Sequence, residues 1–157
     1  MLRRMLIGPD STSRGPQPPV FDWKTSELTL PGEWSVHERR LQGGASEGVH
    51  VVELCNGPIT LSVQPTRGMG VWNAAVGDLP VGWNSPVSQP VHPQHVDLTL
   101  RNGLGWLEGF NELLCRCGLS SVGPPGNDDA APAPVESQLT LHGRIANTPA
   151  HTVEVGV

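Results

Sequence analysis

Two basic side chains near the carboxyl end of the sequence, His142 and Arg144, are the residues best suited to bind a polar ligand. If this segment is a strand, side chains two residues apart point the same way, so both could face one cleft. Histidine gains or loses a proton near neutral pH, and arginine supplies fixed donors to hydroxyl groups. Without a ligand, the histidine could instead cap a turn at Gly143, and the arginine could pair with an exposed acid.

Four further side chains could contribute to binding, and each also has a structural explanation. Arg67 follows a predicted strand and could place its guanidinium at the rim of a cleft, or it could bond to loop carbonyls. Trp83 could offer a flat apolar face to a ligand, although tryptophan is more often part of a core. Asn147 precedes a Thr-Pro pair, which favours a turn in which its side chain bonds to its own backbone. His92 lies in a proline-rich loop that could border the cleft.

Two groups of residues match metal-ligand patterns only in part. His92, His95 and Asp97 could hold a metal ion, but no third histidine is close in sequence. Cys115 and Cys117 form a C-x-C pair, which is a weak zinc signal without a second pair. We therefore interpret the first group as a polar loop and the second as two structural thiols. The sequence predicts no metal and no cofactor.

The composition excludes several classes of protein. Glycine and proline total 19 + 16 = 35 of 157 residues, against roughly 12% in average proteins, so long helices are disfavoured. The net charge of −5 argues against electrostatic binding of nucleic acid, and no apolar run approaches the ~20 residues of a membrane span. The three cysteines, Cys55, Cys115 and Cys117, lack a disulfide spacing, so we expect reduced thiols and a cytoplasmic location.

The hydrophobic pattern predicts two β-hairpins followed by a loop. In residues 49–61, apolar positions alternate on both sides of Asn56-Gly57, a dipeptide typical of tight hairpin turns. Residues 71–76 and 79–83 form a second strand pair, joined through Gly77-Asp78. Residues 84–97 contain three prolines and are expected to be an ordered loop.

One short helix is expected within residues 104–119. Its apolar face would carry Trp106, Phe110, Leu113 and Leu114. We place Trp106 in the core. Glu108 and Glu112 are four residues apart and would share a helix face. They could act as the carboxylate pair of a glycosidase, but a solvated face is the simpler interpretation.

These elements predict an all-β, predominantly antiparallel fold with one short helix. Two more strands are expected where Leu and Val alternate, at residues 139–141 and 153–157. Residues 1–32 are expected to be a poorly ordered leader, and residues 33–157 a single unit that contains a Pro/Gly/Ala-rich loop at 120–137. The alternating pattern still runs at Val157, so we expect either that a complete protein continues beyond it or that a partner supplies the following portion.

A series of motifs, taken in order, resembles one known family. They are RGMG at 67–70, GWNSP at 82–86, HP at 92–93, GLGWLEGFNELL at 103–114, RCGL at 116–119 and LHGRIANTPA at 141–150. Over roughly residues 36–157 the chain resembles the aldose 1-epimerase-like proteins of the galactose mutarotase superfamily, in particular their DUF4432 branch. The resemblance implies a large antiparallel β-sandwich, called a supersandwich, with a carbohydrate cleft on one concave face.

The resemblance also implies an activity, the interconversion of the anomers of an aldose. In the family pattern, the histidine acid and the glutamate base lie downstream of the stretch that matches residues 141–150. They would therefore fall beyond Val157, which leaves the catalytic residues unknown. His142 would line the cleft, and Arg144 would contact sugar hydroxyls or an anionic substituent. The expected partner is an aldose. A non-catalytic carbohydrate-binding module and a truncated inactive remnant are the alternatives.

Overall fold

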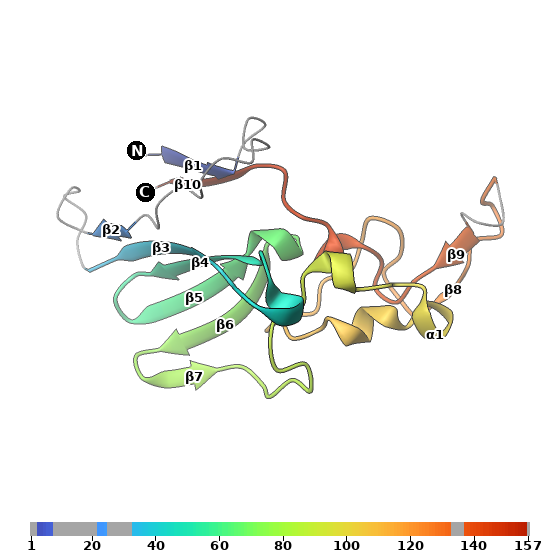
Figure 1. Ribbon diagram of the computed structural model, residues 1–157, viewed down its shortest axis with the longest axis horizontal. Helices are drawn as coiled ribbons and strands as arrows, with labels where there is room; N and C mark the ends of the chain where they lie inside the picture. Colours follow the sequence, from blue (N-terminus) through green and yellow to red (C-terminus); the bar gives the residue numbers. More distant parts are fainter. Residues whose placement is uncertain (1–2, 8–21, 25–32, 133–136, 157) are drawn as a thin grey trace.

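The computed structural model describes residues 3–7, 22–24, 33–132 and 137–156 (Figure 1). Its main element is a six-stranded antiparallel sheet in which each strand pairs with its neighbours in sequence. In spatial order the strands are β2 (Asp22–Lys24), β3 (Ser35–Arg40), β4 (His50–Cys55), β5 (Ile59–Gln64), β6 (Gly70–Val76) and β7 (Leu79–Val81). The predicted antiparallel all-β class is confirmed.

Two smaller antiparallel pairs accompany this sheet. Strand β1 (Arg3–Ile7) pairs with β10 (Val153–Gly156), and β8 (Gly126–Asn127) pairs with β9 (Gln138–Leu139). Strands β1 and β2 belong to the expected leader, whose other residues lie outside the described ranges, as do residues 133–136 of the predicted loop and residue 157. No helix in the described ranges is long and apolar enough to cross a membrane.

Both predicted hairpins are confirmed. At the first turn, Asn56 N donates to Ile59 O at 3.0 Å, and the Asn56 side-chain oxygen accepts from Ile59 N at 3.0 Å. Gly57 has φ 93°, a conformation that costs glycine little. The second hairpin joins β6 to β7 through Gly77, and β7 ends at Val81.

The core receives side chains from the six-stranded sheet, from β10 and from the loop-rich part of the chain. Its buried apolar side chains are Val36, Val49, Val51, Val52, Trp106, Ala146 and Val153. Trp106 is 3% exposed, as the sequence predicts, and its ring stacks on Phe110 with centroids 4.3 Å apart. Figure 1 shows the six-stranded sheet on one side and the loop-rich segment on the other.

The predicted helix over residues 104–119 is wrong. The α-helix that the described chain contains is one turn, α1 (Leu100–Gly103), followed by a 3₁₀ turn at Gly105–Glu108. From Phe110 to Leu119 the chain is not helical. Leu113 N donates to Val71 O at 2.8 Å, where β7 no longer pairs with β6. The segment therefore bonds to the sheet rather than to itself.

The predicted strand at residues 139–141 stops at Leu139, whereas the strand at 153–157 is confirmed as β10.

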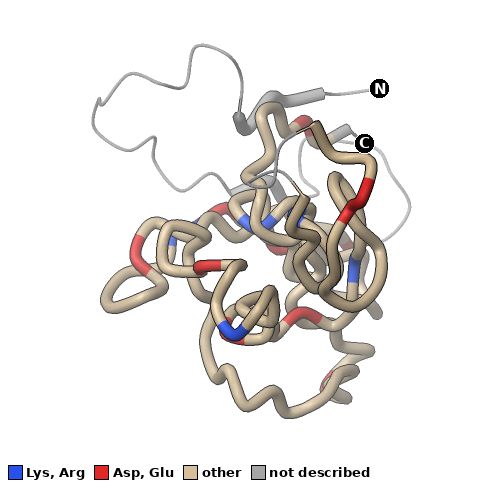
Figure 2. The backbone as a smooth tube through the Cα atoms, turned by 90° about the vertical axis from the view of Figure 1, so that its right-hand side faces the viewer, with Lys and Arg blue, Asp and Glu red and all other residues tan. Residues whose placement is uncertain are grey.

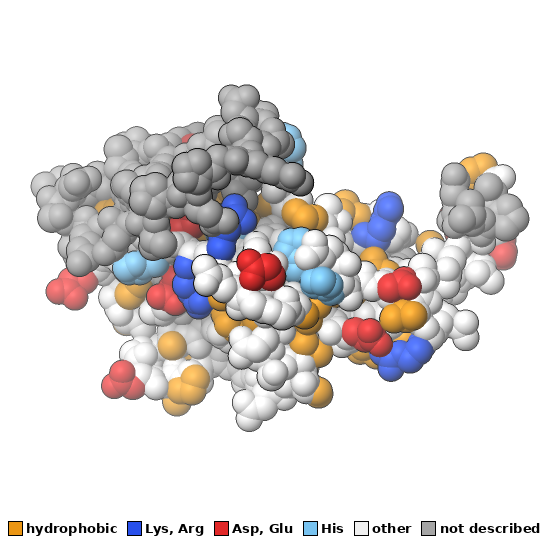
Figure 3. Space-filling view, in the orientation of Figure 1, with side chains coloured by type: hydrophobic (Ala, Val, Ile, Leu, Met, Phe, Trp, Pro, Cys, Tyr) orange, Lys and Arg blue, Asp and Glu red, His pale blue; other side chains and the backbone are white. Residues whose placement is uncertain are grey.

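Basic and acidic residues are interspersed along the chain (Figure 2). The face in Figure 3 likewise mixes charged, polar and hydrophobic side chains. Both signs of charge are therefore available on that face.

Candidate functional site

Arg67 is the centre of a buried polar network beside the sheet. It ends the 3₁₀ turn Pro65–Arg67 that follows β5, and its side chain is fully buried. Its Nε and Nη2 atoms each lie 3.1 Å from Glu112 Oε1. Its Nη1 atom donates to Val91 O at 2.8 Å and to Asn147 Oδ1 at 3.0 Å. One guanidinium thus joins the β5 turn to three segments distant in sequence.

Arg116 extends this network toward the chain surface. Its Nη2 atom donates to Arg67 O at 2.7 Å and lies 3.8 Å from Glu112 Oε1, and its Nη1 atom donates to Gly68 O. Burial lowers the pKa of Arg116 and the Glu112 carboxylate opposes that shift. We call Arg67, Glu112, Arg116 and Asn147 the Arg67 cluster.

The cluster corrects the interpretation of Glu112. Glu112 is 1% exposed and is the counterion of Arg67. Glu108 is exposed and lies 3.4 Å from Arg101. The two carboxylates therefore do not share a solvated helix face. Asn147 also differs from expectation, because its side chain bonds to Arg67 across the fold.

An open pocket of about 370 Å³ lies next to the cluster, and we call it the Trp83 pocket. Its lining residues are Trp72, Asn73, Trp83, Asn84, Ser85, Val87, Ser88 and Asn111. Trp83 is 47% exposed, and its Nε1 atom donates to Glu112 O at 3.0 Å, so the cluster holds one wall of the pocket. Ser85 Oγ donates to Phe110 O at 2.8 Å.

Asn111 is the unusual member of this pocket. It is 6% exposed, yet neither its Oδ1 nor its Nδ2 atom has a hydrogen-bond partner in the described chain. Buried amides are almost always bonded, and an unpaired one costs about 1–3 kcal/mol. Both atoms are shielded from solvent, so the side chain would have to rotate toward the pocket to bond to a ligand or a water there.

The Trp83 pocket can bind a small polyhydroxylated ligand. Two indoles offer apolar faces to C–H groups, while amides and hydroxyls offer donors and acceptors at fixed positions. None of the described lining residues titrates near neutral pH. These residues can therefore bind and orient a ligand, but a proton transfer would need groups from elsewhere.

His142 and Arg144 do not face one cleft as the sequence predicts. His142 has φ 56°, so it lies in a turn rather than a strand. Its ring is edge-on to Trp106, with centroids 4.7 Å apart, and its Nδ1 atom lies 3.1 Å from Cys117 Sγ. Arg144 is exposed and lines a second pocket of about 590 Å³. That pocket's other lining residues are Leu98, Thr99, Ser120, Gln138, Leu139 and Thr140.

The His92 loop does not assemble the metal site that was considered for it. His92 Nδ1 accepts from Gln94 N at 3.2 Å, and Asp97 Oδ1 accepts from the backbone and hydroxyl of Thr99 at 2.9 and 2.6 Å. Burial, followed by the positive charges of His95, Arg40 and Arg67, lowers the pKa of His92. These contacts fit the interpretation of a polar loop.

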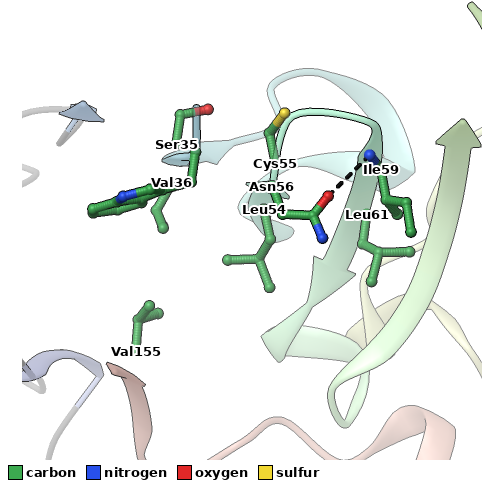
Figure 4. Close-up of a pocket in the computed structure, with 9 residues that line it drawn as sticks. Ser35, Val36, Leu54, Cys55, Asn56, Ile59, Leu61 and Val155 are labelled. Carbon is green, nitrogen blue, oxygen red and sulfur yellow. Dashed lines mark hydrogen bonds between the residues drawn. The ribbon is translucent and has the colours of Figure 1, made fainter. Parts of the chain in front are cut away.

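A third pocket, of about 280 Å³, lies between the six-stranded sheet and β10 (Figure 4). Figure 4 shows side chains of Val36, Leu54, Leu61 and Val155 around it. An apolar lining of this kind does not suit a sugar, because it leaves hydroxyl groups without partners.

Comparison with known proteins places the chain in a family. Residues 46–157 match DUF4432, described as a domain of unknown function. The chain belongs to the DUF4432 family. No curated protein matches it.

A solved structure is similar to almost the whole of this DUF4432 chain. It is the crystal structure of a "putative aldose 1-epimerase" from Klebsiella pneumoniae subsp. pneumoniae MGH 78578. The two share 33% sequence identity with a TM-score of 0.83, over 98% of this chain and 38% of that chain. The predicted aldose 1-epimerase-like β-sandwich fold is thereby confirmed. The DUF4432 chain spans 38% of the length of this relative.

Sequence reasoning missed Asn111, Trp72 and the burial of Glu112. Nothing local marks Glu112 as buried, because its partner Arg67 is 45 residues away. Asn111 precedes Glu112 in the expected helix, where a buried unpaired amide has no sequence signature. Trp72 lies on a strand that was correctly predicted, but the pocket beside it depends on the loop at residues 83–88.

Proposed function

We propose that this chain binds an aldose in the Trp83 pocket, as part of a mutarotase-like protein that interconverts the anomers of that sugar. The observation that carries the proposal is the similarity to the aldose 1-epimerase-like crystal structure along nearly the entire chain. The pocket supports it independently, because it combines indole faces, amides and hydroxyls around an unpaired buried amide.

Each part of the site would have a distinct role. Trp72 and Trp83 would pack against the C–H faces of the sugar, and Asn111 would bond to one of its hydroxyls. The Arg67 cluster would act as a positioning element, since Glu112 follows Asn111 directly and its carbonyl accepts from the Trp83 indole. In this scheme the chain contributes affinity and orientation.

Anomer interconversion itself needs a proton acceptor and a proton donor. A base removes the proton from the C1 hydroxyl while an acid protonates the ring oxygen, which opens the ring; rotation and reclosure then give the other anomer. We propose that this acid and base come from the part of the fold that this chain does not cover. A carbohydrate-binding module without such a pair is the alternative function.

The second pocket gives an alternative location for the sugar, and there Arg144 would be the charged side chain that contacts it. Its lining includes Thr140, which is 7% exposed and whose hydroxyl has no partner in the described chain. We favour the Trp83 pocket because it has aromatic walls. The same experiment can distinguish the two locations.

The test is calorimetric titration of the full chain with D-galactose and D-glucose. Trp83→Ala and Asn111→Ala should each weaken sugar binding about tenfold or more, equivalent to about 1.4 kcal/mol. Asn127→Ala, an exposed asparagine on β8, is the matched control and should bind normally. Loss of binding in Arg144→Ala, with normal binding in Trp83→Ala and Asn111→Ala, would indicate that the sugar binds in the second pocket. No binding of either sugar would contradict the proposal.

Polarimetry separates the enzyme from the binding module. A solution of pure α-anomer should lose its excess optical rotation faster with the longest natural form of the protein than with buffer. Binding without acceleration would favour the carbohydrate-binding module.

A further inference from the structure

Three potential metal ligands converge on one another, and none of them lines the Trp83 pocket. The thiols of Cys115 and Cys117 and one ring nitrogen of His142 all lie within 4.8 Å of one another. Cys117 Sγ and His142 Nδ1 are 3.1 Å apart. Within the described ranges, this is the one group of three His, Cys, Asp or Glu side chains placed closely enough to hold an ion.

The local backbone explains how the two thiols come to face the same direction. Residues 115–117 are not helical, and Cys115 and Cys117 are exposed while the Arg116 side chain turns inward to the carbonyls of Arg67 and Gly68. The two sulfur atoms accordingly lie within 4.8 Å of each other. The C-x-C spacing therefore supplies two sulfur atoms to one site.

His142 reaches these thiols through a close approach of two backbones. Gly118 N donates to His142 O at 3.0 Å, and Arg144 N donates to Gly118 O at 2.9 Å. A side chain at Gly143 would overlap the carbonyl oxygens of Gly118 and Ser121, so only glycine allows this contact. His142 itself has φ 56°, a strained conformation for a bulky residue that often marks functional positions.

We propose that Cys115, Cys117 and His142 bind one Zn²⁺ ion. Thiolate and imidazole are the ligands that zinc prefers, and three protein ligands leave one tetrahedral position for water or another small ligand. Small side-chain movements would place each donor atom at the usual distances, about 2.3 Å for sulfur and 2.0–2.1 Å for nitrogen. The exposure of both cysteines leaves that fourth position open to solvent.

Binding would displace protons from the thiols. Two thiolates balance the charge of Zn²⁺, and the protons released go to solvent. The apparent zinc affinity should therefore increase with pH through the neutral range.

The test titrates the reduced, metal-free full chain with Co²⁺ alone, followed by displacement with Zn²⁺. One equivalent of Co²⁺ should produce a thiolate-to-cobalt charge-transfer band and the intense visible bands of tetrahedral cobalt. Replacing a residue that only hydrogen-bonds to a metal ligand typically costs about 10–100-fold in metal affinity. Loss of a ligand itself in Cys117→Ser or His142→Gln should therefore cost more than about 100-fold. Cys55→Ser, which changes the third free cysteine, should bind normally.

A second measurement does not depend on the folding of any variant. Stoichiometric Zn²⁺ should protect Cys115 and Cys117 of the unmodified chain from alkylation, as mapped by mass spectrometry, while Cys55 stays reactive. Equal protection of all three cysteines, or none, would overturn the proposal. So would cobalt spectra without a thiolate band, or tight binding that persists in a Cys115→Ser/Cys117→Ser variant.

Discussion

The buried pair of Arg67 and Glu112 gives the sharpest energetic prediction. The side chains are 0% and 1% exposed, and Glu112 Oε1 accepts a 3.1 Å hydrogen bond from Arg67 Nε and lies 3.1 Å from Arg67 Nη2. Removing one member of a buried pair leaves an uncompensated charge and typically costs about 3–5 kcal/mol. Glu112→Leu should therefore destabilise the chain by about that amount, which is a large part of the 5–15 kcal/mol of a typical domain.

Arg67→Met should destabilise the chain at least as much as Glu112→Leu does, because the larger of two opposing effects increases the cost. Arg116 stays 3.8 Å from Glu112 and partly compensates the carboxylate, which reduces the cost. However, Val91 O and Asn147 Oδ1 lose their donor, and each buried group left unpaired adds about 1–3 kcal/mol. The double variant buries no isolated charge at this pair, so its cost should fall below the sum of the single costs by about 2–3 kcal/mol.

Urea unfolding followed by the fluorescence of the five tryptophans measures these differences. The exposed pair Arg101–Glu108 is the matched control, and Glu108→Gln should change stability by less than about 1 kcal/mol. Additive effects of Arg67→Met and Glu112→Leu, within about 0.5 kcal/mol, would show that the two side chains are not coupled and would refute the reasoning.

Two further predictions concern folding. Burial, followed by the charge of Arg40, lowers the pKa of His50 to about 4, although Glu38 Oε1 lies 2.8 Å from Nε2. The unfolded chain takes up this proton near pH 6.5, so the free energy of unfolding should fall by about 3 kcal/mol as the pH drops from about 6.5 to 4. His50→Gln should remove this pH dependence from the urea midpoints. An unchanged pH dependence in the variant would exclude His50 as its source. Gly68 has φ 59°, and an added Cβ would overlap Ile145 O. Gly68→Ala should therefore lower the free energy of unfolding by more than about 1–3 kcal/mol. A thermal midpoint equal to that of the parent chain would contradict this close approach.

The parts of the fold that the sequence predicts correctly are those fixed by short-range contacts. The Asn56-Gly57 turn closes through bonds between Asn56 and Ile59, three residues apart, so its signal lies within one window of sequence. The placement of Trp106 in the core also follows from a local property, its large apolar surface.

The candidate site depends on contacts that no window of sequence contains. Arg67 meets Glu112 across 45 residues and Asn147 across 80. His142 meets Cys117 across 25 residues, and its turn conformation depends on Gly118. The two-residue spacing of His142 and Arg144 therefore predicted that both side chains share one face of a strand, but the backbone forms a turn there. Trp83 was identified from its residue type, but its partner Asn111 has no such mark.

The failed helix prediction and the functional chemistry of residues 111–117 have the same physical cause. A helix over this segment would satisfy its backbone internally, and would separate the directions of Cys115 and Cys117 by about 200°. Instead, Leu113 N bonds to Val71 O, and the chain passes along the sheet without helical turns. This path lets Asn111 line the Trp83 pocket and Glu112 meet Arg67, while both thiols face His142. Gly109 contributes, since an added Cβ would lie 3.0 Å from Arg67 Nη1, so the guanidinium occupies the space beside the segment. The pattern of apolar residues indicated a helix, but the buried arginine and the free sheet edge determine the structure.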